Sequence, residues 1–165
     1  MRGRVYVTLA ATVGVLLGTL LSPLGGALAG HTNTILTADL DGRQEVAADG
    51  SQAIAGDPNG RGEAYVFGID GDAKTLCYVL TVDKIGPATA AHIHEGPAGS
   101  NGPVVVNLAA PGDGDAADCL TEGETGKFVD GQTVAEILAN PEGYYVNVHN
   151  AEYPGGAIRG QLSGI

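Results

Sequence analysis

Residues 62–82 read GEAYVFGIDGDAKTLCYVLTV. β-Branched and aromatic side chains dominate two runs in and around this segment, at 62–69 and 74–83, and such side chains favour β-strands. Asp70-Gly71 lies between the runs and is a hairpin signal, because these residues tolerate the positive φ of a tight turn. The segment therefore predicts two antiparallel strands joined by a short turn.

The same pattern extends in both directions from this hairpin. Clusters of Gly, Asp, Asn and Pro separate six further strand-like runs, at 34–41, 90–95, 103–108, 117–121, 143–149 and 156–162. Eight short strands predict an all-β sandwich or barrel. One short helix is expected where Thr133 and Glu136 form a capping box, with Pro141 ending it. Residues 47–60 have few apolar side chains and predict a mobile loop.

The N-terminus has the three parts of a secretory signal peptide. Arg2 and Arg4 precede an apolar run from Val5 to Leu21, and Ala27-Leu28-Ala29 fits the small-x-small cleavage rule. A retained membrane anchor is the alternative, since the run is at the short end of what spans a bilayer. We expect residues 1–29 to be removed, residues 30–33 to form a short tail and residues 34–165 to form one secreted or envelope-associated domain, with no membrane span after cleavage.

Composition narrows the range of partners. Without Arg2 and Arg4 the chain keeps six basic residues against 19 acidic ones, a formal charge of −13. Such a surface repels phosphate backbones and argues against a nucleic-acid partner. Cys77 and Cys119 are the only cysteines. In an exported chain they predict a structural disulfide, and a metal site built on them is the weaker alternative because they lack close spacing.

The residues best suited to chemistry are histidines on two predicted strands. Side chains alternate along a strand, so His92 and His94 share one face of the run 90–95, and Asn147 and His149 share one face of the run 143–149. If these strands are neighbours, three imidazoles converge, and imidazole nitrogen is a good ligand for copper(II) and zinc(II). Separate structural roles for each histidine are the alternative.

Three longer segments resemble the CHRD domain, a family first described in the developmental inhibitor chordin and widespread in bacterial exported proteins. They are Ala91–Leu108, Tyr145–His149 and Gly156–Leu162, with Leu40–Val46 fitting the family's first strand and following loop. The resemblance covers residues 34–163. It implies a Greek-key β-sandwich of immunoglobulin-like type, related to Cu/Zn superoxide dismutase.

The relation to the dismutase implies roles for particular residues. His92-Ile93-His94-Glu95 and Val148-His149 are similar to its copper-binding segments, so the resemblance implies that His92, His94 and His149 are copper ligands. Arg159 is similar in position to the active-site arginine of the dismutase, so the resemblance implies that Arg159 guides anions. A plain ion pair with one of the many carboxylates is the other interpretation of Arg159, and the one we favour.

Departures from the dismutase pattern matter equally. No histidine lies between His94 and His149, so the zinc site and the bridging ligand are missing. His31 would be the second residue after cleavage, where the amine and imidazole can chelate copper together. An N-terminal tail without such a role is the favoured alternative for His31.

Two functions from different classes remain. The first is a secreted domain that holds copper at the three histidines, with dismutase-like catalysis a less favoured extension. The second is a non-catalytic extracellular module, free of metal, that binds another protein or the cell envelope. Motifs for serine hydrolases, phosphate loops and nucleotide binding are absent from the sequence.

Overall fold

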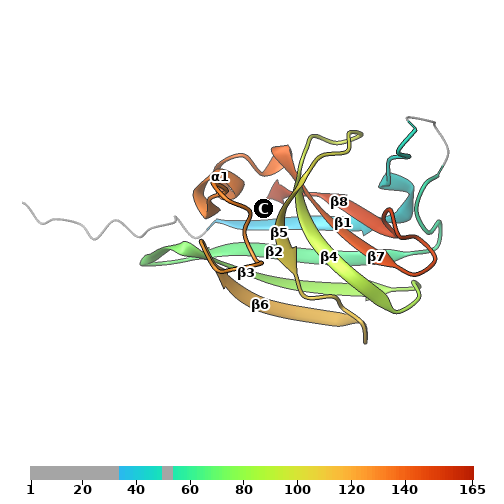
Figure 1. The fold of residues 1–165 in the computed structure, drawn as a ribbon, viewed down its shortest axis with the longest axis horizontal. Coiled ribbons are helices and arrows are strands. Elements are labelled where there is room, and N and C mark those ends of the chain that lie inside the picture. Colours follow the sequence, from blue (N-terminus) through green and yellow to red (C-terminus); the bar gives the residue numbers. More distant parts are fainter. Residues whose placement is uncertain (1–33, 50–53) are drawn as a thin grey trace, which may run out of the picture.

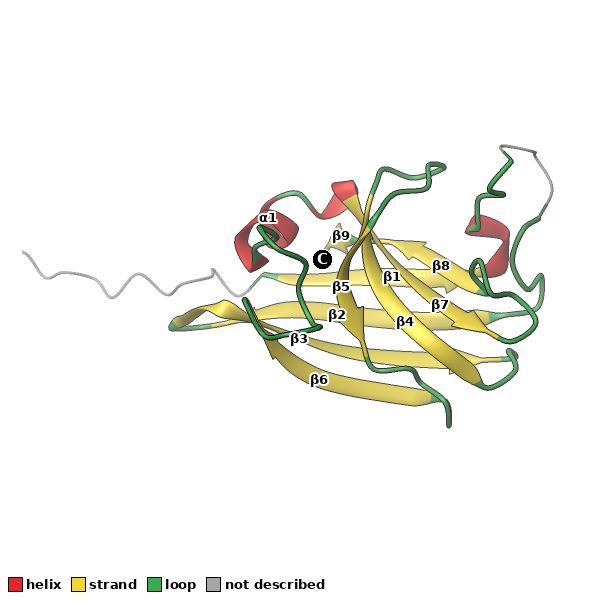
Figure 2. Cartoon of the chain, in the orientation of Figure 1, coloured by secondary structure: helices red, strands yellow, loops and turns green. Residues whose placement is uncertain are grey.

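A computed structural model describes residues 34–49 and 54–165, which form two layers of antiparallel strands (Figure 1, Figure 2). The hydrogen-bonded order is β5-β4-β7-β8-β1-β2-β3-β6, and β9 pairs with β1. The strands are β1 (Ile35–Asp41), β2 (Arg61–Ile69), β3 (Asp72–Asp83), β4 (Ala88–Glu95), β5 (Val104–Leu108), β6 (Asp115–Thr121), β7 (Tyr144–Asn150), β8 (Ile158–Gln161) and β9 (Ser163–Gly164). The helical elements are η1 (Gly42–Gln44), α1 (Val134–Ala139) and η2 (Pro141–Gly143).

The predicted hairpin is present and lies at the centre of one layer. β2 and β3 pair antiparallel, with Phe67 opposite Cys77, and Gly71 adopts a φ of 81° in the turn. The chain then crosses to the other layer for β4 and β5, and β6 returns to lie beside β3. This arrangement is of the Greek-key type. The all-β sandwich with one short helix is therefore confirmed for the described residues.

The core lies between the two layers and is built from every second side chain of each strand. Leu80 on β3, Ile93 on β4 and Val146 on β7 are fully buried there. Burying such side chains is the main favourable term in folding, at about 25 cal/mol per Å² of apolar surface. The alternation leaves the remaining side chains of β4, β7 and β8 on the far side of their layer, where the histidines lie.

The cysteines form the predicted disulfide. Cys77 on β3 and Cys119 on β6 are directly opposite each other, with Cα atoms 4.0 Å apart, and their sulfur atoms are bonded. The bond closes a segment with a sequence separation of 42 and fixes the edge strand β6 to its neighbour. A metal site on these two residues is thereby ruled out in this structure.

The helix forms where it was predicted, whereas the C-terminal strands differ from the predicted run at 156–162. Thr133 caps α1 through the predicted capping box with Glu136, and Ile137 is buried against the strands, so one side of the helix joins the core. β8 begins at Ile158 rather than at residue 156, since Gly156 has a φ of 143°, outside the strand region. β9 was not predicted, because a two-residue Ser-Gly strand has no sequence signal of its own.

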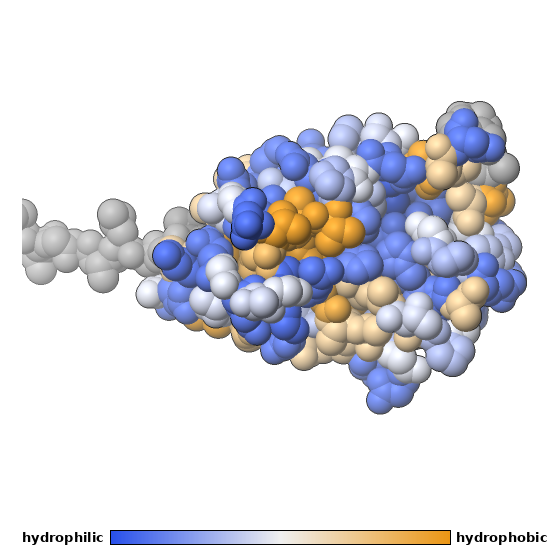
Figure 3. Space-filling view, in the orientation of Figure 1, coloured by the Kyte–Doolittle hydropathy of each residue, from blue (hydrophilic) through white to orange (hydrophobic). Residues whose placement is uncertain are grey.

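The visible surface is mainly hydrophilic, and its most prominent apolar group lies near β5 and α1 (Figure 3). Within residues 34–49 and 54–165, no helix is long and apolar enough to cross a membrane. The predicted signal peptide at residues 1–29, the tail at residues 30–33 and His31 lie outside the described residues, as does part of the predicted loop at 47–60.

Candidate metal centre

β4 and β7 are neighbouring strands, so the two histidine segments meet. Their antiparallel register puts His92 opposite Asn147, His94 opposite Tyr145 and Ala90 opposite His149. All three imidazoles lie on the face of this layer that points away from the core. The condition on which the three-histidine prediction depended is therefore met.

The imidazoles are close enough to act together. His92 Nδ1 and His149 Nε2 are 3.1 Å apart. One ring nitrogen from each of His92, His94 and His149 can be chosen so that all three lie within 4.8 Å of one another. All three residues are at least partly buried, and the ring centroids of His94 and His149 are 6.3 Å apart. The three form a compact nitrogen cluster.

Backbone carbonyls determine which nitrogens are free to bind. His94 Nδ1 donates to the Gly102 carbonyl oxygen at 2.9 Å, and His149 Nδ1 donates to the Pro154 carbonyl oxygen at 3.1 Å. A proton held on Nδ1 leaves a lone pair on Nε2. His94 Nε2 is buried and has no hydrogen-bond partner among the described residues. Orientation of the rings by outer carbonyls is the usual arrangement of metal-binding histidines.

The environment keeps the cluster neutral. Burial lowers the pKa of His92, and the neighbouring His149 and His94 add to this effect because a second imidazolium nearby is unfavourable, so that the pKa falls to about 4. Burial also lowers the pKa of His94 and of His149, although the hydrogen bonds to carbonyls act in the opposite direction. At neutral pH all three rings are uncharged, which is the form that binds a metal.

The geometry is compatible with a transition metal. Metal–imidazole bonds of about 2.0–2.1 Å in a tetrahedral site put neighbouring nitrogens about 3.3 Å apart. The observed 3.1 Å between His92 Nδ1 and His149 Nε2 is close to that value. His94 lies farther away, and it offers a ring nitrogen within 4.8 Å of a nitrogen of each of the other two. The nitrogen donors suit copper and zinc rather than calcium or magnesium, which prefer oxygen.

Tyr145 and Arg159 support His94 from one side. The His94 and Tyr145 rings are stacked, with centroids 4.8 Å apart and planes 9° from parallel. The Arg159 guanidinium carbon lies 3.4 Å from the Tyr145 ring centroid on β7. Tyr145 also accepts a hydrogen bond from the Gly102 backbone N–H through its hydroxyl oxygen, at 3.1 Å. Gly102 thus connects both rings to the loop at residues 96–103.

Arg159 has a different environment from the ion pair favoured on sequence grounds. Its side chain is 2% exposed, and its guanidinium donates to the carbonyl oxygens of Pro97 and Ser100, at 3.1 and 2.7 Å. A longer contact of 3.4 Å reaches Asn101 Oδ1. The sequence missed this arrangement because the carbonyl acceptors belong to a loop about 60 residues earlier. Arg159 anchors that loop over the outer face of β7 and β8.

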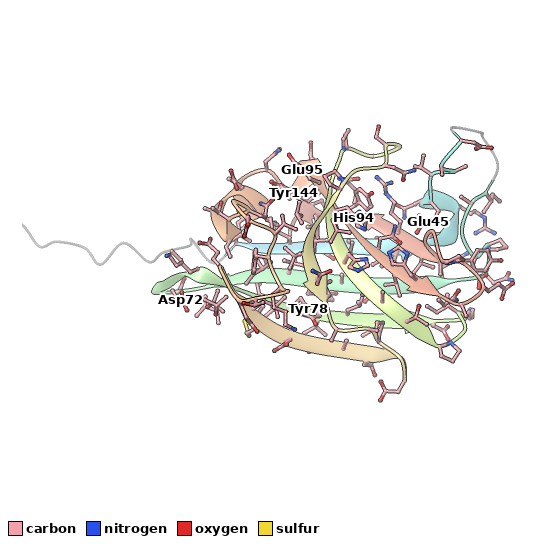
Figure 4. All side chains as sticks on the ribbon, viewed as in Figure 1. Glu45, Asp72, Tyr78, His94, Glu95 and Tyr144 are labelled. Carbon is pink, nitrogen blue, oxygen red and sulfur yellow. A yellow bond between two sulfur atoms is a disulfide. The ribbon has the colours of Figure 1, made fainter. Side chains whose placement is uncertain are left out.

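Glu45 also lies at this site, although the sequence did not predict it as a site residue. It follows η1 (Figure 4) and is 7% exposed. It accepts a hydrogen bond from Asn147 Nδ2 at 3.4 Å. Burial raises the pKa of Glu45 and outweighs Arg159 and Asn147, which act to lower it, so that the pKa is about 7. Glu45, Asn147 and His94 line one cavity of about 640 Å³ between the segments at 45–49, 101–102 and 155–156. No local pattern marks Glu45, because its partner is 102 positions away.

Replacing Glu45 with glutamine is expected to stabilise the metal-free protein at alkaline pH. A carboxyl whose pKa rises from 4.5 unfolded to about 7 folded costs nothing below pH 4.5, and its full cost is present above pH 7. That cost is about 3 kcal/mol, and neutral glutamine avoids it. Chemical unfolding of chelator-treated protein should therefore show a gain of about 3 kcal/mol at pH 8 and little difference at pH 4. Glu63→Gln, at an exposed site, is the matched control, and a loss of stability by Glu45→Gln at pH 8 would contradict the expectation.

The sequence was compared with models of known protein families. The family model of the CHRD domain matches residues 36–162, which is nearly all of the described chain. The chain belongs to the CHRD domain family. No curated protein and no solved structure matched it. The three histidines, Arg159 and Glu45 all lie inside the CHRD domain.

Proposed function

We propose that this CHRD domain works outside the cytoplasm and binds one transition-metal ion, copper being favoured, through His92, His94 and His149. The observation that carries the proposal is the cluster of three neutral imidazoles whose nitrogens lie within 4.8 Å of one another. The basic, apolar and small-residue segments of the first 29 residues support export, and the disulfide is consistent with an oxidising compartment.

The role that this chemistry supports is holding or buffering the metal. When bound, the ion would supply Lewis acidity or one-electron chemistry, as metals do in such nitrogen sites. His94 and His149 would offer Nε2, with their Nδ1 protons held by Gly102 and Pro154, and His92 would offer Nδ1. Because a zinc-binding histidine set is missing between His94 and His149, a two-metal centre of the dismutase kind is not proposed.

Copper titration of the mature, chelator-treated protein tests the proposal. We expect one copper(II) per chain, with a spin-resonance spectrum of nitrogen ligands, and each of His92→Gln, His94→Gln and His149→Gln should weaken binding at least about tenfold. Every variant should be made in a His31→Gln background, because a free amine next to His31 can itself chelate copper. An unchanged spectrum and affinity in the triple variant would overturn the metal site and favour the metal-free interaction module.

A further inference from the structure

Tyr145 is connected to His94 in two separate ways. Its ring stacks on the imidazole, with centroids 4.8 Å apart and planes 9° from parallel. Its hydroxyl oxygen accepts a hydrogen bond from the Gly102 N–H at 3.1 Å, and the Gly102 carbonyl oxygen accepts one from His94 Nδ1 at 2.9 Å. Tyr145, Gly102 and His94 therefore form one closed network of contacts, and His94 Nε2 takes no part in it.

The surroundings leave the Tyr145 side chain little freedom to move. It is 1% exposed and lies directly opposite His94 in the register of β4 and β7. β7 lies between β4 and β8, so Tyr145 has His94 on one side and Arg159 on the other. The Arg159 guanidinium carbon is 3.4 Å from the ring centroid, an attractive arrangement of a cation over an aromatic ring. The ring is thus held between the imidazole and the guanidinium.

Gly102 is held in the same way against the end of β4. The Glu95 N–H donates to the carbonyl oxygen of Pro103, the residue after Gly102, at 3.0 Å. An added Cβ at residue 102 would overlap the Glu95 carbonyl oxygen, so only glycine lets the loop approach β4 this closely. The Gly102 residue is therefore a fixed acceptor for His94 and a fixed donor for Tyr145.

This network determines where the His94 ring carries its proton. A carbonyl oxygen only accepts hydrogen bonds, so a neutral imidazole bonded to it holds its proton on Nδ1 and keeps its lone pair on Nε2. His94 Nε2 is buried and has no hydrogen-bond partner in the part of the chain that the structure describes. If the network were lost, the ring could rotate or change its tautomer, and either change would remove this lone pair from the histidine cluster.

We propose that Tyr145 is a positioning residue for the metal centre: it fixes the His94 ring by stacking and keeps the proton on Nδ1 through Gly102. Its effect on metal binding rests on the proposed function, whereas the positioning is a property of the metal-free protein. Removing outer groups that orient metal-binding histidines typically weakens metal affinity by about 10–100-fold. Tyr145 thus contributes to the affinity of the site without being a ligand.

Three variants separate the two connections. Tyr145→Phe removes the hydroxyl and keeps the ring, whereas Tyr145→Leu removes both. Tyr144→Phe is the matched control, because it removes the same group from the neighbouring residue. The Tyr144 ring belongs to the core, and its hydroxyl accepts a hydrogen bond from Gln132 at 3.3 Å. Nitrogen NMR of isotope-labelled, chelator-treated protein at pH 8 measures the tautomer of each imidazole without any metal.

We expect the Nδ1–H tautomer of His94 to predominate in the parent and in Tyr144→Phe. Tyr145→Phe should raise the population of the Nε2–H form about fivefold, because Gly102 loses one of the hydrogen bonds that hold it. Tyr145→Leu should bring the two forms to comparable populations. In the His31→Gln background, copper(II) affinity should be unchanged in Tyr144→Phe and at least about tenfold weaker in Tyr145→Leu.

Other results would overturn the inference. Unchanged tautomer populations in Tyr145→Leu, or equal effects of Tyr144→Phe and Tyr145→Phe, would show that Tyr145 does not position His94. A parent that binds copper no more tightly than Tyr145→Leu would refute the effect on affinity. A parent that binds no copper would instead contradict the metal function, and the NMR comparison would still decide the positioning. Tyr145→Phe is nearly isosteric, so the test does not depend on the leucine variant folding.

Discussion

Replacing Cys77 and Cys119 together with alanine is expected to lower the free energy of unfolding by about 4 kcal/mol. The bond closes a loop with a sequence separation of 42, and the chain-entropy model assigns about this value to a loop of that length. Denaturant unfolding of both proteins at one pH measures the difference.

The reduced parent protein provides the control for this prediction. With reductant present it should unfold at nearly the same denaturant concentration as the double variant, because both lack the cross-link. A double variant within about 1 kcal/mol of the oxidised parent would show that β3 and β6 are held by their pairing and packing alone.

Replacing Arg159 with methionine is the other change with a large expected effect. The variant loses the hydrogen bonds to Pro97 and Ser100 and the contact with the Tyr145 ring, and it leaves the Glu45 carboxylate without its neighbouring positive charge. Removing one member of a buried charged arrangement costs about 3–5 kcal/mol. We expect a loss of this size at pH 8, measured by denaturant unfolding.

An exposed arginine gives the matched control. Arg43 forms an ion pair with Asp41 at 3.7 Å and its side chain is 53% exposed, so Arg43→Met should change stability by no more than about 0.5 kcal/mol. Arg159→Lys keeps the charge but loses the two-pronged geometry, and should fall between Arg159→Met and the parent. Equal, small losses for Arg43→Met and Arg159→Met would refute the anchoring role of Arg159.

Local signals were sufficient to predict much of the fold. Asp70-Gly71 marks the β2–β3 hairpin because the turn needs a positive φ, and the structure has 81° at Gly71. The capping box at Thr133 marks the start of α1 because its two hydrogen bonds are made within four residues. Features without such local chemistry were missed, as β9 shows. Alternation along strands likewise predicted which face His92, His94 and His149 share.

The surroundings of the histidines could not be predicted in this way. Glu45 meets Asn147 across 102 positions, and Arg159 meets Ser100 across 59. These contacts depend on how two loops settle on the outer face of β7 and β8, which strand periodicity does not describe. The cavity beside Glu45 and the position of Arg159 therefore could not be predicted from the sequence.

The histidines and their covering loops belong to parts of the molecule with different resistance to opening. His92, His94 and His149 lie on β4 and β7, which are paired along most of their length, so their backbone amides should exchange with solvent deuterium only through rare, large-scale opening. The segments at 45–49 and 155–156, which border the cavity, lie outside these paired strands. Their backbone amides should therefore exchange sooner than those of the three histidines.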